Sequence, residues 1–211
     1  MTVLRTSGAA GAVLLCLAAL AAADSISFVS TWKAPGAAPI DFAGKKVGAA
    51  LIVDDENLRV SAEEALAREL DARGSIGVPA YRVVPREELR NKDAAKGFFE
   101  RAGIAGLVVL RLVGTETTST DSPVVWSSGY YAHPWDYWGA SWTQPYSIGG
   151  GGQHTTITVE VLLYDLARDA PIWAAVTRSK DPKDVQTYMK KLAADVGKRL
   201  EKDHLVRRTA R

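Results

Sequence analysis

The side chains best suited to chemistry in this sequence gather near one histidine. The candidate groups in the stretch 127–154 are His133, His154, Asp136, Ser127, Ser128 and Ser141. Imidazole, carboxylate and hydroxyl groups together make a hydrolase triad, and pairs of imidazoles bind zinc. The sequence has neither the His-Glu-x-x-His nor the Gly-x-Ser-x-Gly spacing that would specify such a site. We therefore expect no catalytic residues and no bound metal, with His133 and His154 as weak candidate ligands.

The same region is unusually aromatic. Eight of the 21 residues from 126 to 146 are Trp or Tyr, and four glycines follow at 149–152. Trp and Tyr combine a large apolar area with a polar tip, which suits contacts with proteins, sugars or membrane interfaces. The rings would either cover the sheet as a local cluster or form a binding surface. The candidate binding residues are Trp126, Tyr130, Tyr131, Trp135, Tyr137, Trp138, Trp142 and Tyr146.

The glycine-rich segments do not match phosphate-binding motifs. Residues 149–152 lead into a predicted strand, whereas such motifs place glycines between a strand and the start of a helix. We therefore expect no nucleotide cofactor, and no cofactor of another kind is indicated. The chain has 26 basic and 24 acidic residues, and this near balance gives no sign of nucleic-acid binding.

The first 23 residues have the pattern of a secretory signal peptide. Arg5 precedes an apolar run at 9–22, and small residues at 21–23 predict cleavage after Ala23. The only cysteine, Cys16, lies inside this leader, so the mature chain has no thiol. Lipid attachment at Cys16 is less favoured, because Leu15 stands where a small residue is normally required. We expect an exported protein that is periplasmic or associated with the envelope.

The elements that must position these groups follow from periodicity. Apolar or alternating runs predict strands at 46–53, 81–84, 106–117, 154–166 and 172–179, and the segment 25–31 is either a short edge strand or an arm. Four-residue spacing predicts a helix over 56–73, and shorter patterns predict helices over 94–102 and from 182 to about 202. Glu160 shares a strand face with threonines, and we expect a solvated or edge carboxylate there.

This order indicates an α/β fold, bordering on α+β. We predict a five-stranded mixed sheet of order 2-1-3-4-5, in which strand 4 is antiparallel and helices cover the faces. The expected organisation is a signal peptide 1–23, a leading segment and linker 24–45, one domain 46–204 with the aromatic and glycine-rich insertion 119–153, and a basic tail 205–211.

Diffuse features along the chain resemble an uncharacterised family of small bacterial envelope proteins, many of them lipoproteins. The features are the segment 27–33, the helix 58–73, the turn at 102–103, the aromatic-glycine loop, and Tyr164-Asp165-Leu166 leading to Ile172-Trp173-Ala174. The element order is more distantly similar to the amino-terminal domain of TolB and to the curli-secretion lipoprotein. The resemblance implies an envelope interaction domain rather than an enzyme.

The sequence thus favours a non-catalytic exported protein of the cell envelope that binds a partner through its aromatic loop or a sheet edge. The expected partner is an envelope protein or a second copy of the chain. Two alternatives stay open. One is a small exported hydrolase or metal-dependent enzyme, and the other is a glycan- or lipid-binding module.

Overall fold

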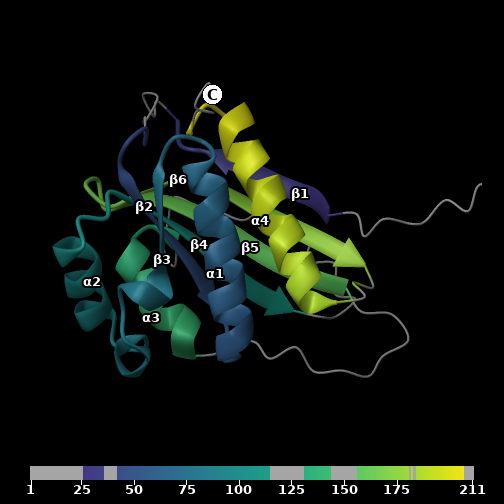
Figure 1. The fold of residues 1–211 in the computed structure, drawn as a ribbon. Coiled ribbons are helices and arrows are strands. Elements are labelled where there is room, and N and C mark those ends of the chain that lie inside the picture. Colours follow the sequence, from purple (N-terminus) through teal and green to yellow (C-terminus); the bar gives the residue numbers. More distant parts are fainter. Residues whose placement is uncertain are drawn as a thin grey trace, which may run out of the picture.

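The sheet at the centre of the molecule has six strands. The computed structural model describes residues 26–35, 42–114, 131–143, 156–180, 182 and 184–206. The strands are β1 (Ile26–Lys33), β2 (Lys46–Ile52), β3 (Ile76–Pro79), β4 (Gly106–Gly114), β5 (Thr156–Asp165) and β6 (Ala170–Lys180). They lie in the order β1-β6-β5-β4-β2-β3 (Figure 1). β2 is parallel to β3 and β4, and the other pairs are antiparallel.

The mixed α/β class and the antiparallel strand 154–166 are confirmed, but the predicted count and order of strands are wrong. One reason is that the segment 25–31 is no arm: β1 pairs with β6 from Ile26 to Lys33 and adds a sixth strand at one edge. The other reason is that the strand beside β2 is 76–79, not 81–84.

The predicted strand 81–84 is a helical turn because its amide hydrogens are already bonded. The amides of Val83 and Val84 both donate to the carbonyl oxygen of Ala80, at 2.9 Å each. The amide of Tyr81 donates to the carboxylate of Glu63, at 2.7 Å. A strand needs such donors for its neighbour in the sheet, so this segment forms a 3-10 turn at Ala80–Arg82 instead.

Of the four α-helices in the described residues, three lie close to their predicted positions. They are α1 (Glu56–Asp71), α2 (Lys92–Arg101) and α4 (Val185–Lys202). Their first turns are capped by the side chains of Asp55, Asn91 and Asp184, each of which accepts an amide hydrogen bond. The fourth helix is α3 (Pro134–Thr143). It lies within residues 126–146, called the aromatic segment below, where the sequence pattern predicted only an insertion.

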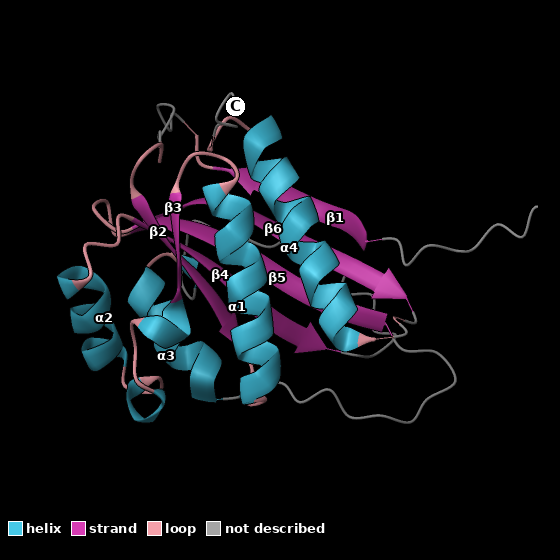
Figure 2. Cartoon of the chain, in the orientation of Figure 1, coloured by secondary structure: helices cyan, strands magenta, loops and turns pink. Residues whose placement is uncertain are grey.

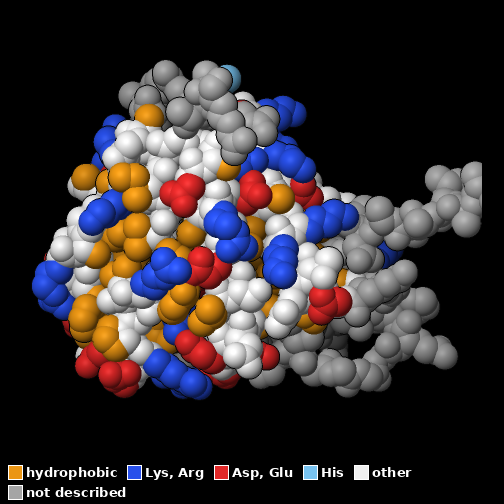
Figure 3. Space-filling view, viewed as in Figure 1, with side chains coloured by type: hydrophobic (Ala, Val, Ile, Leu, Met, Phe, Trp, Pro, Cys, Tyr) orange, Lys and Arg blue, Asp and Glu red, His pale blue; other side chains and the backbone are white. Residues whose placement is uncertain are grey.

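The helices cover both faces of the sheet. Val47, Ala49 and Leu51 of β2 pack with α1 and α4, whereas the alternate residues Ala50 and Ile52 pack with α2 and α3. Figure 2 shows α1 and α4 running side by side across the near face of the strands. The surface on this side carries acidic and basic side chains interspersed (Figure 3).

Candidate binding site

The aromatic segment contributes mostly to the core. Of the eight candidate rings, Trp126, Tyr130 and Tyr146 lie outside the described residues. Four of the others lie on α3 and are buried, and Tyr131 is half-buried. The buried candidates are Trp135, Tyr137, Trp138 and Trp142. Because a ring buried in the core offers little surface to a partner, these four act in this conformation as a cover for the sheet.

Ring contacts fix α3 against α2. The ring of Phe99 on α2 meets Trp138 edge-on, with centroids 5.5 Å apart, and lies 5.8 Å from Trp135. The indole N–H of Trp138 donates to the carbonyl oxygen of Leu89 at 2.8 Å. Tertiary contacts of this kind hold a short helix that would be unstable alone.

Glu160 is the polar centre of the same region, and its predicted solvated or edge environment is wrong. Its side chain is only 7% exposed, and Oε1 accepts a hydrogen bond from the hydroxyl of Tyr131 at 2.7 Å. Oε2 accepts from the hydroxyl of Tyr137 at 3.0 Å and lies 3.3 Å from Nη1 of Arg111. These donors and the guanidinium offset the cost of burying a carboxylate. The cluster joins the aromatic segment to β4 and β5.

A second buried carboxylate lies where α1 meets the sheet. Glu63 is 1% exposed, and its two oxygens accept the amide hydrogens of Leu51 (3.1 Å) and Tyr81 (2.7 Å). The guanidinium of Arg59, itself 2% exposed, lies 3.7 Å away. Burial raises the pKa of Glu63 to about 8, although Arg59 and the two amides act in the opposite direction. The four-residue apolar spacing of this helix gives no sign that either charge is buried.

The described catalytic candidates do not form a triad. Nδ1 of His133 lies 3.0 Å from Oδ2 of Asp169, at the turn between β5 and β6. Asp136 accepts from Lys92 at 2.8 Å, and this ammonium lowers the pKa of Asp136. Ser141 is fully buried, whereas His133 and Asp136 are exposed. His154, Ser127 and Ser128 lie outside the described residues. Within the described ranges, no three acidic, His or Cys side chains are grouped to hold a metal ion.

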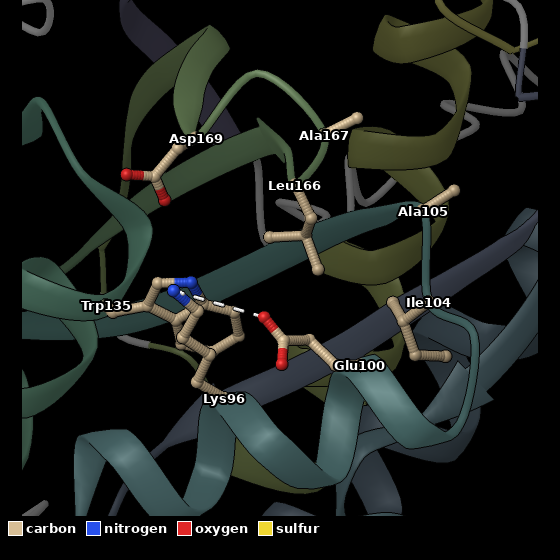
Figure 4. A pocket seen from close by; sticks show the side chains of 8 residues that line it. All are labelled: Lys96, Glu100, Ile104, Ala105, Trp135, Leu166, Ala167 and Asp169. Carbon is tan, nitrogen blue, oxygen red and sulfur yellow. Dashed lines mark ion pairs between the residues drawn. The ribbon is translucent and has the colours of Figure 1, made fainter.

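A groove of about 470 Å³ lies beside Trp135. Its walls are α2, the turn before β4, the first turn of α3, and the turn between β5 and β6 (Figure 4). It is lined by Lys96, Glu100, Ile104, Ala105, Trp135, Leu166, Ala167 and Asp169. The sequence pattern did not predict this groove, because its walls come from four separate segments.

The two edge strands of the sheet, β3 and β1, differ in how far their backbone is available to pair with a further strand. β3 has four residues, ends at Pro79, which has no amide hydrogen, and donates the amide hydrogen of Gly77 to Oδ1 of Asp71 at 2.8 Å. β1 has eight residues with a bulge at Val29, and in the described part of the chain no strand pairs with its outer side. Among the described strands, β1 is therefore the open edge.

Several solved structures are similar to this chain, and three of them are described below. No family model and no curated protein matches the chain. The PelC dodecamer from Paraburkholderia phytofirmans is 15% identical, with a TM-score of 0.45, over 89% of this chain and 100% of that one. A PelC variant dodecamer from the same organism is 13% identical, with a TM-score of 0.45, over 82% and 95%.

The third similar structure is lipoprotein GNA1162 from Neisseria meningitidis. It is 14% identical, with a TM-score of 0.39, over 76% of this chain and 99% of that one. None of these three likenesses supports an argument about function at such scores. The similarity to TolB and to the curli-secretion lipoprotein stays a prediction. Among the described helices, none has the length and apolar character needed to cross a membrane.

Proposed function

We propose that this chain is an exported, non-catalytic domain of the cell envelope that binds a protein partner by strand addition at β1. The observation that carries the proposal is the contrast between the two sheet edges. Asp71 and Pro79 close the edge at β3, whereas in the described part of the chain no strand pairs with the outer side of the eight residues of β1. A free edge of this length is a template for an added strand.

The side chains of β1 fit this role. Ser27, Val29, Thr31 and Lys33 are exposed, and Val29 is 48% exposed although it is a large apolar residue. Main-chain hydrogen bonds would supply affinity, and the side chains of Ser27 and Val29 would supply specificity. Thr31 and Lys33 already bond to Arg199 and to the carbonyl oxygen of Asp203. The partner is an extended protein segment, contributed by an envelope protein or by a second copy of this chain.

The aromatic segment has a supporting part in this proposal. Its four buried rings hold α3 on the sheet, and Tyr131 is the half-buried ring of the set. Any direct contact with a partner would therefore fall to Tyr131 and to the candidates outside the described residues, Trp126, Tyr130 and Tyr146. The export part of the proposal depends on the leader 1–23.

Site-specific photocrosslinking tests strand addition with a matched control. A photoreactive phenylalanine analogue is placed at Val29 on β1 or at Ile76 on β3, which are 48% and 47% exposed. We expect a discrete adduct in intact cells from position 29 and none from position 76. Its mass distinguishes a second copy from another protein. Equal labelling from both positions, or none from position 29, would reject strand addition at β1.

Export is tested separately by mass spectrometry of the mature amino terminus after cell fractionation. We expect an envelope fraction whose chain begins at Asp24. A lipid-modified Cys16 would instead indicate an anchored protein, and cytosolic protein that retains Met1 would reject export.

A further inference from the structure

The groove beside Trp135 has an apolar floor and an acidic rim. Ile104, Leu166 and Trp135 supply apolar surface, while the carboxylates of Glu100 and Asp169 come from α2 and from the turn between β5 and β6. Figure 4 shows Glu100 on α2, paired with Lys96, and Asp169 on the turn between β5 and β6, with Trp135 between them in this view. No residue of β1 lines the groove, so this site is separate from the proposed strand addition.

The charges of the groove favour a cation. Two carboxylates and one ammonium, that of Lys96, line the groove. Nζ of Lys96 lies 3.9 Å from Oε1 of Glu100, and the two side chains are 45% and 62% exposed. An ion pair this exposed is weak, so another cation can replace Lys96 at Glu100. Asp169 uses Oδ2 to bind His133, and within the described residues its Oδ1 accepts no hydrogen bond. Each wall therefore offers a carboxylate oxygen to an incoming donor.

The backbone at Asp169 supports a role for its side chain. Its φ is 49°, in the left-handed region that glycine adopts most easily. Asp is tolerated there at some cost, because its short polar side chain makes local hydrogen bonds. Glycine would make the same turn without a carboxylate at the rim of the groove.

We propose that this groove binds a single basic side chain, lysine or arginine, of a peptide. The methylene stem would lie on Ile104, Leu166 and Trp135, and the charged head would reach Glu100 and Asp169. Long basic side chains bury their stems on apolar surface in this way while the head binds carboxylates. The volume of about 470 Å³ lies within the range of small-ligand sites.

The test is a titration of the folded mature chain with N-acetyl-lysine methylamide, followed by NMR at the indole N–H of Trp135. The norleucine compound supplies the same stem without the charge, and the glutamate compound supplies the opposite charge. We expect a saturable shift with the lysine compound and a much weaker response to the other two. An equal shift with the norleucine compound would show that the groove binds the apolar stem without regard to charge, and would overturn the proposal. A stronger response to the glutamate compound would also overturn it.

Charge variants separate the proposal from nonspecific attraction. Asp169→Asn and Glu100→Gln each remove one carboxylate, and each should weaken binding about threefold, whereas Lys96→Gln should strengthen it by a similar factor. Asp93→Asn is the matched control, because Asp93 is an exposed acid on α2 that does not line the groove. All four changes are at exposed positions, so the fold is retained. Equal weakening by Asp93→Asn, or weaker binding by Lys96→Gln, would overturn the proposal.

Discussion

Tyr131 and Glu160 are joined by a hydrogen bond of 2.7 Å that fastens the segment before α3 to the middle of β5. Tyr137, six residues further along the chain, donates to the other oxygen of the same carboxylate at 3.0 Å. A candidate binding ring, Tyr131, is thus held in place by a buried acid. The carboxylate of Glu160 serves as the anchor of the aromatic segment.

We expect Tyr137→Phe to lower the free energy of unfolding by about 1.5–3 kcal/mol, because it removes a buried hydrogen bond to a charged group. Tyr131→Phe should cost less, since its side chain is half-buried and water can replace the lost hydroxyl. Urea unfolding of each tyrosine variant, alone and combined with Glu160→Gln, measures the coupling energy between that tyrosine and Glu160. The anchoring role would be contradicted if both tyrosine substitutions lowered the free energy of unfolding equally and did so by the same amount in the Glu160→Gln variant.

Much of the fold was predictable because it depends on local patterns. Leu58, Leu66 and Leu70 recur at helical spacing, and Asp55 caps the helix that they predict. The helix α3 also had a signal, since Trp135, Trp138 and Trp142 are spaced by three and four residues. The density of aromatic residues and the four glycines at 149–152 indicated an insertion instead.

The site could not be predicted in the same way because its contacts are distant in sequence. The partners of Glu160 come from residues 23 and 29 positions earlier and from a neighbouring strand. Likewise, Arg59 and Glu63 have the composition of a solvated helix face, and only the amides of Leu51 and Tyr81 explain why Glu63 is buried. Local periodicity does not contain such long-range pairings.

The raised pKa of Glu63 predicts a pH dependence of stability. Between 4.5 and about 8, folded Glu63 keeps a proton that the unfolded chain has lost, so stability falls as the pH rises through this window. We expect a loss on the order of a few kcal/mol, and Glu63→Gln should flatten the slope. Thermal unfolding from pH 5 to pH 8 checks this, with the exposed Glu87→Gln as control. If the stability of Glu63→Gln fell with pH as steeply as that of the wild type, Glu63 would not be the source of the pH dependence.

The burial of α3 predicts that the aromatic segment cannot be removed without loss of the fold. Trp138 is 1% exposed, and Trp138→Ala should cost about 3–5 kcal/mol through the lost contacts and the cavity left behind. Val29→Ala, at an exposed position, should stay within about 0.5 kcal/mol of the wild type. Urea unfolding compares them. A stable Trp138→Ala variant would show that the ring is not part of the core, and deletion of 126–146 would then be a clean test of binding.

Alanine substitutions at Gly77 and Gly97 should change the stability in opposite directions, because β3 lies close to α1 at Gly77. A Cβ on Gly77 would lie within 2.9 Å of three backbone atoms of Ala67, so Gly77→Ala must push β3 away from α1. We expect a loss of about 1–3 kcal/mol, as in overpacked cores. On α2, a Cβ on Gly97 would meet only the flexible end of Arg101, at 3.1 Å. Gly97→Ala should therefore stabilise the helix by about 0.5–1 kcal/mol. Unfolding curves that move in the same direction for both variants would contradict the packing of β3 against the backbone of α1.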